Sequence, residues 1–224
     1  MPFKAVIFDL DGTLADTLED IADAMNRTLS VNGYPTHRYD IYRFLVGKGL
    51  KNLVTRSLPE QARSETVIEQ CYAEMLDDYT ENYINKTRPY SGIQDLLNIL
   101  SQRAVKMAVL SNKDDTITRK ICCKLFPDRY FDIVLGSTAR FPHKPDPSAA
   151  LFLAEKMRIS PVEVIYLGDS DVDMQTATAA GFYAVGAGWG FRPEEELLNS
   201  GAQKVIHRPE ELLSLFDTRP LYSP

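Results

Sequence analysis

Four acidic residues in two short segments are the first candidates for chemistry. Asp9 and Asp11 lie in Asp-Leu-Asp-Gly-Thr, and Asp169 and Asp173 lie in Gly-Asp-Ser-Asp-Val-Asp. Alternation along an extended chain would place the first two carboxylates on one side, which is unfavourable unless a cation or a shared proton relieves the repulsion. The second two are four residues apart, close enough on a helix to face the same cation as the first two. Oxygen ligands favour magnesium over zinc, so the segments predict a Mg²⁺ site.

Each segment also has a structural interpretation that needs no cation. The first could be a polar turn in which Gly12 supplies the bend. In the second, Ser170 or Asp171 could cap a helix, where acidic residues also suit the helix dipole. Capping accounts for one of these acids but not for the whole set of polar groups.

Two further segments offer groups that could bind a phosphoryl group. Ser111, Asn112 and Lys113 follow an apolar run, and a hydroxyl with successive backbone N–H groups could cradle phosphate there. Lys144 lies in Pro-His-Lys-Pro, near the start of a predicted helix, and could present a rigid positive charge. The alternatives are a helix cap at Ser111 and a solvated surface lysine at Lys144.

The elements expected around these segments alternate between strands and helices. Apolar runs predict buried strands at 4–8, 107–110, 133–135, 164–167 and 183–185, and helical patterns occur at 93–100, 116–125, 147–157 and 172–180. This alternation predicts an α/β fold with a Rossmann-like parallel sheet covered on both faces. The candidate segments lie at strand ends or helix starts, and the carboxyl ends of strands are where such sheets bind ligands.

Residues 16–85 have a different pattern, with helix after helix and no convincing strand. A first helix has apolar side chains on one face from Leu18 to Leu29, and a second long pattern runs over 64–83. Pro89 and Gly92 mark the return to the sheet. We therefore predict an α/β core of residues 1–15 and 86–224 and an all-helical insertion of residues 16–85.

The composition is ordinary for a globular protein and disfavours several kinds of partner. The chain has 224 residues, of which 44% are hydrophobic and 25% charged, and its net charge is −6. This charge disfavours nucleic acid and anionic lipid as partners. No apolar stretch approaches the ~20 residues that cross a bilayer, and the N-terminal pattern is not that of a signal peptide. We therefore expect a cytoplasmic protein with no membrane partner, and leave its oligomeric state open.

In their order along the chain, these segments resemble the motifs of the haloacid dehalogenase superfamily, and within it the phosphoglycolate phosphatase-like branch. The four motifs are matched by residues 9–13, Ser111-Asn112, Lys144-Pro145 and residues 168–173. The resemblance implies that Asp9 is the nucleophile and Asp11 the general acid/base. Dehalogenating members do not carry an aspartate at the position of Asp11, so the match favours phosphate chemistry.

The resemblance also implies roles for the other groups. Magnesium would be held by Asp9, the backbone carbonyl of Asp11 and Asp169, with Asp173 supporting it directly or through water. The transferring phosphoryl group would be bound by Ser111, Asn112 and Lys144. The implied activity is a magnesium-dependent phosphatase that hydrolyses a small phosphorylated metabolite, similar to phosphoglycolate, through an aspartyl phosphate.

The helical insertion resembles the small cap that covers the site in this branch. Residues 47–54 are similar to the glycine-containing cap segment of phosphoglycolate phosphatases, so Lys48 or Lys51 could meet a substrate carboxylate. A solvated turn remains the alternative for these lysines.

Two other functions remain possible for the same motifs. A phosphosugar mutase, similar to β-phosphoglucomutase, would use the same two aspartates and return the phosphoryl group to substrate. A receiver-type signalling domain also combines acids, a hydroxyl and a lysine, but it is about half this length. The core motifs do not separate phosphatase from mutase, and they do not identify the substrate.

Overall fold

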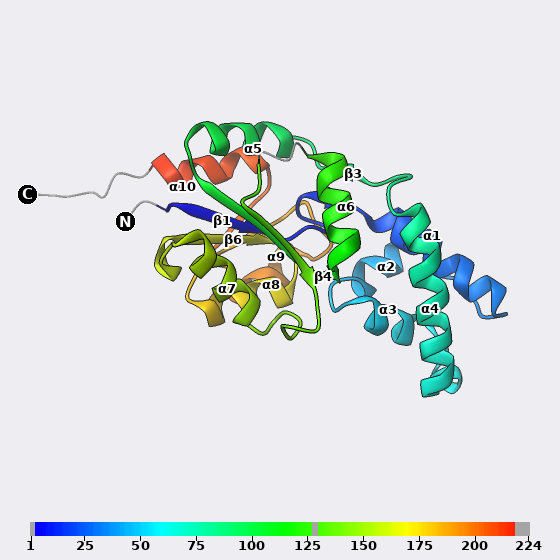
Figure 1. Ribbon diagram of the computed structural model, residues 1–224. Coiled ribbons are helices and arrows are strands. Elements are labelled where there is room, and N and C mark those ends of the chain that lie inside the picture. The colour runs from blue at the N-terminus through cyan, green and yellow to red at the C-terminus, as the bar shows by residue number, and fades with distance from the viewer. Residues whose placement is uncertain (1–2, 127–129, 218–224) are drawn as a thin grey trace, which may run out of the picture.

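A six-stranded sheet forms the centre of the protein, with its strands in the order β5-β4-β1-β6-β7-β8 (Figure 1). The strands are β1 (Ala5–Phe8), β4 (Lys106–Asp114), β5 (Ile133–Ser137), β6 (Val164–Gly168), β7 (Tyr183–Ala187) and β8 (Lys204–Ile206). All neighbouring strands pair in parallel. The computed structural model describes residues 3–126 and 130–217. Because β1 lies between β4 and β6, its carboxyl end is a switch point of the kind where such sheets bind ligands.

Helices cover both faces of this sheet. They are α5 (Ile93–Gln102), α6 (Asp115–Leu125), α7 (Ser148–Met157), α8 (Asp171–Ala180), α9 (Glu194–Asn199) and α10 (Ser214–Asp217). In β1, Val6 and Phe8 pack in one apolar cluster with side chains of α5 and α6. Ala5 and Ile7 pack in the opposite cluster with α7 and α8. Burial on both faces explains why β1 is an uninterrupted apolar run.

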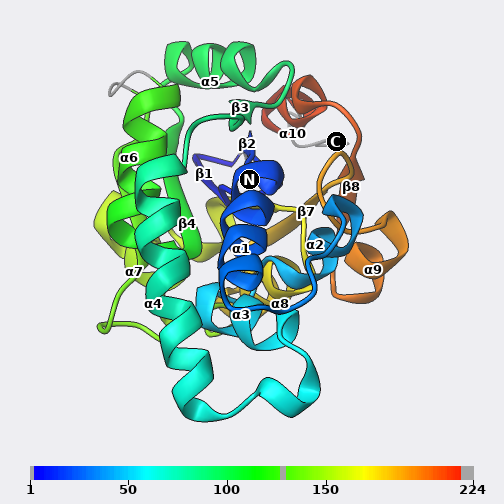
Figure 2. The ribbon, with the colours of Figure 1, turned by 90° about the vertical axis from the view of Figure 1, so that its right-hand side faces the viewer.

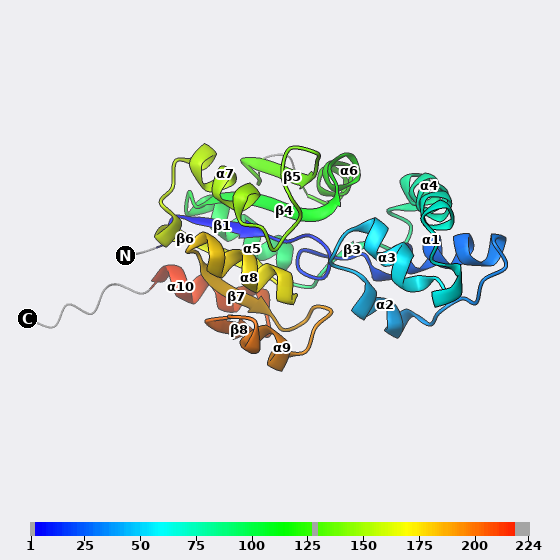
Figure 3. The ribbon, with the colours of Figure 1, turned by 90° about the horizontal axis from the view of Figure 1, so that it is seen from below.

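Four α-helices between β2 (Ala15–Asp16) and β3 (Arg88–Pro89) lie beyond the carboxyl ends of β1 and β4 (Figures 1 and 3). They are α1 (Leu18–Val31), α2 (Tyr39–Leu45), α3 (Leu50–Ser57) and α4 (Glu65–Asn82). Helices α1 and α4 pack side by side (Figure 2), and α3 packs on α4. The chain enters and leaves this helical group through β2 and β3, which pair in antiparallel fashion.

The predicted fold class, a mostly parallel sheet with flanking helices, is confirmed. The sequence pattern misses β8 and the pair β2 and β3, because two or three residues are too few to give a recognisable apolar run. Strand β4 also continues past its predicted end to Asp114, with a shift in register after Leu110. The predicted division between residues 1–15 with 86–224 and residues 16–85 remains a prediction. Within the described parts of the chain, no helix is both long and apolar enough to cross a membrane.

Candidate active site

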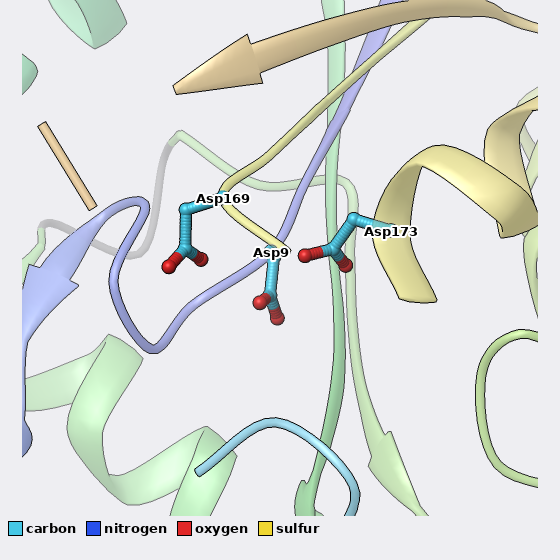
Figure 4. Close-up of side chains that lie close together, drawn as sticks. All are labelled: Asp9, Asp169 and Asp173. Carbon is cyan, nitrogen blue, oxygen red and sulfur yellow. The ribbon is translucent and has the colours of Figure 1, made fainter. Parts of the chain in front are cut away.

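Three carboxylates meet at the carboxyl ends of β1 and β6 (Figure 4). Asp9 follows β1, Asp169 follows β6, and Asp173 lies in the first turn of α8. One oxygen from each lies within 4.8 Å of the others. The N–H of Asp9 donates to Leu167 O at 2.9 Å, which continues the pairing of β1 with β6 by one residue. The parallel sheet thus brings together three of the four acids that the sequence singles out.

Asp169 is held in one orientation by two donors. Thr13 Oγ1 donates to its Oδ1 at 3.0 Å, and the N–H of Phe191 donates to its Oδ2 at 2.8 Å. Glycines make room for this carboxylate: a Cβ at Gly12 would lie 2.2 Å from Asp169 Oδ2, and one at Gly190 would lie 2.2 Å from Asp169 Cβ. Gly12 also has a φ of +86°, so both its conformation and its close approach to Asp169 require glycine.

Asp173 uses both of its oxygens within the protein. Its Oδ2 accepts from the backbone N–H and the hydroxyl of Ser170, which closes a capping box at the start of α8. Its Oδ1 accepts from Lys144 Nζ at 2.7 Å and from the Tyr166 hydroxyl at 3.2 Å. The capping interpretation is therefore correct for Ser170, which is the N-cap of α8, and Asp173 completes the capping box while its other oxygen orients Lys144.

Lys144 is buried in the loop before α7. Its side chain is only 3% exposed, and Nζ lies 2.9 Å from Asp9 Oδ1 and donates to Leu110 O at 3.2 Å. The alternative of a solvated surface lysine is therefore wrong. Burial alone would lower the pKa of Lys144, but Asp173 and Asp9 outweigh it and raise the pKa well above its usual value. The lysine consequently stays protonated beside Asp9, at the end of β1.

The acidic cluster fits a divalent cation. Asp9 Oδ1 is buried and has no hydrogen-bond donor among the described residues, because Lys144 Nζ lies near it without hydrogen-bond geometry. Burial, and then the charge of Asp173, raises the pKa of Asp9 well above its usual range. The same two causes raise the pKa of Asp169 to about 7. A Mg²⁺ ion would relieve this repulsion and give Asp9 Oδ1 a partner, since it prefers carboxylate oxygens.

The Asp11 carboxylate does not join this cluster. Its Oδ1 accepts from Thr17 Oγ1 at 2.5 Å and from the ammonium group of Lys113. The prediction that all four carboxylates face one cation is therefore wrong for Asp11, because these two donors hold its side chain elsewhere. A metal contact through its backbone carbonyl stays a prediction. The sequence analysis names Lys113 only as part of a segment with backbone N–H groups, and the contact of its side chain with Asp11 is not predicted.

Ser111 lies within β4 and does not cap a helix. The N-cap of α6 is Asp114, whose carboxylate accepts from the backbone N–H of Thr116 at 2.9 Å. The helix-cap alternative for Ser111 is therefore wrong. Ser111 Oγ accepts from the N–H of Lys113 at 3.2 Å and lines a pocket, where its hydroxyl proton can point to a ligand.

The Asn112 side chain is occupied by protein partners. Its Nδ2 donates to Gly47 O at 3.0 Å and to Lys144 O at 3.1 Å, and its Oδ1 accepts from the N–H of Lys144 at 2.8 Å. Both amide protons are thus used, so this side chain is not free to donate to a phosphoryl group as predicted. It joins the loop before α3 to the segment that carries Lys144.

A pocket separates this site from the four-helix group. Its floor is formed on the sheet side by Asp9, Asp11, Ser111, Asn112, Lys113, Asp114, Ile117 and Lys144, and its wall in the helical group by Ile21, Val46, Gly47, Gly49, Leu50, Leu53 and Tyr79. The floor carries the charged groups and the wall is mostly apolar. A phosphoryl group could therefore reach the floor while the organic part of its ester lies against the wall.

The two lysines predicted to meet substrate do not line this pocket. Lys48 Nζ pairs with Asp171 at 3.1 Å, and Lys51 Nζ pairs with Glu65 at 3.2 Å and also with Glu69. Their side chains are 48% and 51% exposed. These exposed ion pairs favour the alternative of a solvated turn, and a contact with a substrate carboxylate stays a prediction. The acidic partners on α8 and α4 explain why both side chains turn outward.

Two arginines join the helical group to the loop after β7, a contact that the sequence pattern does not reveal. Arg43 Nη2 donates to Gly190 O at 2.8 Å, and Arg192 Nη2 donates to Val46 O at 2.9 Å. Phe191, between Gly190 and Arg192, supplies the N–H that binds Asp169. One loop thus contacts both the acidic cluster and the helices beyond it.

Comparison with known proteins places these motifs in a family. The profile of the family described as "Haloacid dehalogenase-like hydrolase" matches residues 6–187. Phosphoglycolate phosphatase of Pseudomonas putida is 33% identical over 192 residues, which cover 84% of this chain and 70% of that protein. Phosphoglycolate phosphatase of Aquifex aeolicus is 31% identical over 215 residues, which cover 96% of this chain and 97% of that protein.

The similarity extends to solved structures. A crystal structure of a protein described as a phosphoglycolate phosphatase, from Lactobacillus delbrueckii subsp. bulgaricus, matches with a TM-score of 0.91 at 28% sequence identity. The match covers 96% of this chain and 99% of that one. Together with the sequence relatives, it confirms the resemblance stated from the motifs and the predicted enzyme class, a phosphoric monoester hydrolase.

Proposed function

Because the chain belongs to the haloacid dehalogenase-like hydrolase family, we propose that it is a magnesium-dependent phosphatase of small phosphate monoesters. The observation that carries this proposal is the buried approach of Lys144 to Asp9, 2.9 Å apart, beside the carboxylate of Asp169. Transfer of a phosphoryl group to a carboxylate requires positive charge around the reacting oxygens. The site combines an anionic nucleophile, a lysine and oxygen ligands for a cation.

Asp9 is the proposed nucleophile, and its carboxylate would form the aspartyl phosphate. Lys144 favours the ionised form of Asp9 and would also face the oxygens of the phosphoryl group. Ser111 would donate its hydroxyl proton to the same oxygens. Magnesium, held by Asp9 and Asp169 with support from Asp173, would supply further positive charge where negative charge develops.

Asp11 is the proposed general acid/base. In the first half-reaction it would protonate the leaving oxygen as the bond between that oxygen and phosphorus breaks. In the second it would take a proton from the water that attacks the aspartyl phosphate, which releases phosphate and restores Asp9. Its position supports this role, because Asp11 lines the same pocket as Asp9.

We infer a substrate similar to phosphoglycolate from the names of the relatives, which are phosphoglycolate phosphatases. Residues 16–85 would act as a cap over a core of residues 1–15 and 86–224. The pocket supports this division, because its wall comes from the helical group and its floor from the ends of the strands. The cytoplasmic location stays a prediction from the sequence.

Phosphate release tests the proposal. The purified protein is assayed with Mg²⁺ against 2-phosphoglycolate and a panel of alkyl, sugar and aryl phosphates, beside Asp9→Asn as the inactive control. We expect free phosphate from at least one small ester with the wild type and none above background with Asp9→Asn. No turnover of any ester would contradict a phosphatase, and isomerisation of a sugar phosphate without phosphate release would establish a mutase instead.

A further inference from the structure

Lys113 is a buried lysine between the acid/base of the proposed reaction and the helical group. Its side chain is 7% exposed, and its Nζ donates to Asp11 Oδ1 and, at 2.8 Å, to the hydroxyl of Tyr79. Nζ also lies 5.0 Å from the centre of the Tyr79 ring. Asp11 and Lys113 belong to the sheet side of the pocket, whereas Tyr79 comes from α4.

The two oxygens of Asp11 have different surroundings. Oδ1 accepts from Lys113 and from Thr17, so both of its donors come from the protein. Oδ2 has no hydrogen-bond partner in the described chain, although Asp11 lines the pocket. A carboxylate anchored through one oxygen has a fixed orientation, and its other oxygen is then available to a ligand.

We propose that Lys113 is a positioning residue for Asp11, and that Tyr79 in turn fixes Lys113 from the helical group. The inference rests on the proposed function, because it assigns an acid/base role to Asp11. With Oδ1 held by Lys113, Oδ2 is the oxygen that carries and receives the proton. The support of the acid/base therefore includes Tyr79 of α4 as well as Lys113 of β4.

The proton balance follows from this arrangement. When the ester bond breaks, its electron pair goes to the leaving oxygen, which takes the proton from Asp11 Oδ2 and departs as an alcohol. Asp11 is left as a carboxylate facing the Lys113 ammonium. In the second half-reaction Oδ2 takes a proton from water, the water oxygen bonds to phosphorus, and the bond to Asp9 breaks. Lys113 keeps its protons throughout.

A purely structural role would not require the buried ion pair of Lys113 with Asp11. Burying an ammonium group is unfavourable unless charge and hydrogen bonds compensate, and an apolar pair can fill the same space without that cost. Lys120, seven residues later, offers a natural contrast: it is exposed, lies 6.0 Å from the ring of Tyr83 and has no carboxylate partner among the described residues. The two lysines near α4 thus differ in burial, and only Lys113 is bound to a carboxylate and to a tyrosine hydroxyl.

The test compares esters that need a proton on the leaving oxygen with esters that do not. Lys113→Met, Tyr79→Phe and Lys120→Met are assayed with Mg²⁺ on an alkyl phosphate and on 4-nitrophenyl phosphate. General acid/base catalysis typically contributes ~100- to 10,000-fold, and we expect Lys113→Met to lose ~10- to 100-fold in kcat/KM on the alkyl ester. On the aryl ester the loss in kcat/KM should be much smaller, because this parameter depends only on the first half-reaction, in which the leaving oxygen is protonated. Lys120→Met should match the wild type on both.

Tyr79→Phe keeps the ring and removes one hydrogen bond, so it carries the test if Lys113→Met does not fold. We expect a loss of several-fold in kcat/KM that is confined to the alkyl ester, and partial recovery of alkyl kcat/KM in Lys113→Arg. Equal losses in kcat/KM on both esters, or no loss on either, would overturn the proposal. If the wild type hydrolysed neither ester nor any other phosphate monoester, the proposed function itself would fail, which is a distinguishable result.

Discussion

Lys144 and Asp173 form a buried ion pair, with Nζ 2.7 Å from Oδ1 and side chains that are 3% and 0% exposed. Because of this pair, substitution of Lys144 should affect stability as well as activity. An exposed lysine would affect activity alone, but loss of one partner from a buried pair commonly costs ~3 to 5 kcal/mol of stability. The remaining donors to Asp173, from Ser170 and Tyr166, should reduce that cost.

Lys144→Ala is therefore expected to lose both activity and stability. Removal of one preorganised electrostatic group typically lowers the rate ~100- to 1000-fold. The measurement is kcat with the best ester from the panel, together with urea unfolding of the same preparation. Lys156→Ala on α7, an exposed lysine, is the matched control and should change neither. A folded Lys144→Ala protein with wild-type turnover would remove Lys144 from the mechanism.

Asp9→Asn and Asp11→Asn should differ in which esters they still hydrolyse. A carboxamide is a poor nucleophile and a weaker metal ligand, so Asp9→Asn should abolish turnover of every ester. Asp11→Asn loses proton transfer, so aryl phosphates with good leaving groups should retain more activity than alkyl phosphates. The measurement is the ratio of kcat/KM on the two esters for each variant, since kcat/KM depends only on the first half-reaction. The assigned roles would be wrong if Asp9→Asn stayed active, or if Asp11→Asn lowered kcat/KM equally on both esters.

Magnesium is expected to stabilise the fold as well as to support turnover. The carboxylates of Asp9, Asp169 and Asp173 lie together and are buried, so a bound cation relieves repulsion that exists only in the native state. A ligand present at 100 times its dissociation constant adds ~2.7 kcal/mol. Thermal unfolding with millimolar Mg²⁺ and with a chelator measures this effect, and Asp169→Asn should show a smaller shift. Full activity after thorough chelation would contradict the metal requirement.

The metal-free protein should lose stability between about pH 4 and about pH 7 through Asp169. Its pKa is raised from 3.8 to about 7 by burial and then by Asp173, so over this range the native state binds more protons than the unfolded state. Stability therefore falls as pH rises. Urea unfolding with chelator at both ends of the range measures the slope, and Asp169→Asn should flatten it. Equal slopes for wild type and variant would exclude Asp169 as the cause.

The sequence predicts the sheet and the acidic cluster because both depend on local patterns. A strand that is buried on two faces, such as β1, is recognisable as an apolar run, and a parallel sheet then aligns the ends of its strands. Asp9 and Asp169 consequently meet although they are far apart in the chain.

The interactions that the sequence does not predict depend on side-chain direction. Lys51 and Lys113 are both lysines beside candidate segments, yet Lys51 turns outward to acids of α4 while Lys113 turns inward to Asp11. The difference arises from partners on other elements, which no spacing along the chain encodes. The same holds for Asn112, whose side-chain amide donates hydrogen bonds to the carbonyl oxygens of Gly47 and Lys144.

The short pairing of Ala15 with Pro89 and of Asp16 with Arg88 has a consequence for how the chain can vary. Paired strands lie ~5 Å apart, so the roughly 70 residues between them begin and end almost at the same point. The entropy of closing such a loop grows only with the logarithm of its length, and doubling the length costs about 0.6 kcal/mol more. Insertions or deletions among α1–α4 can therefore accumulate while β1, and with it Asp9, keeps its register in the sheet. Evolution is free to remodel the part of the pocket that faces the organic half of a substrate without disturbing the part that faces its phosphate.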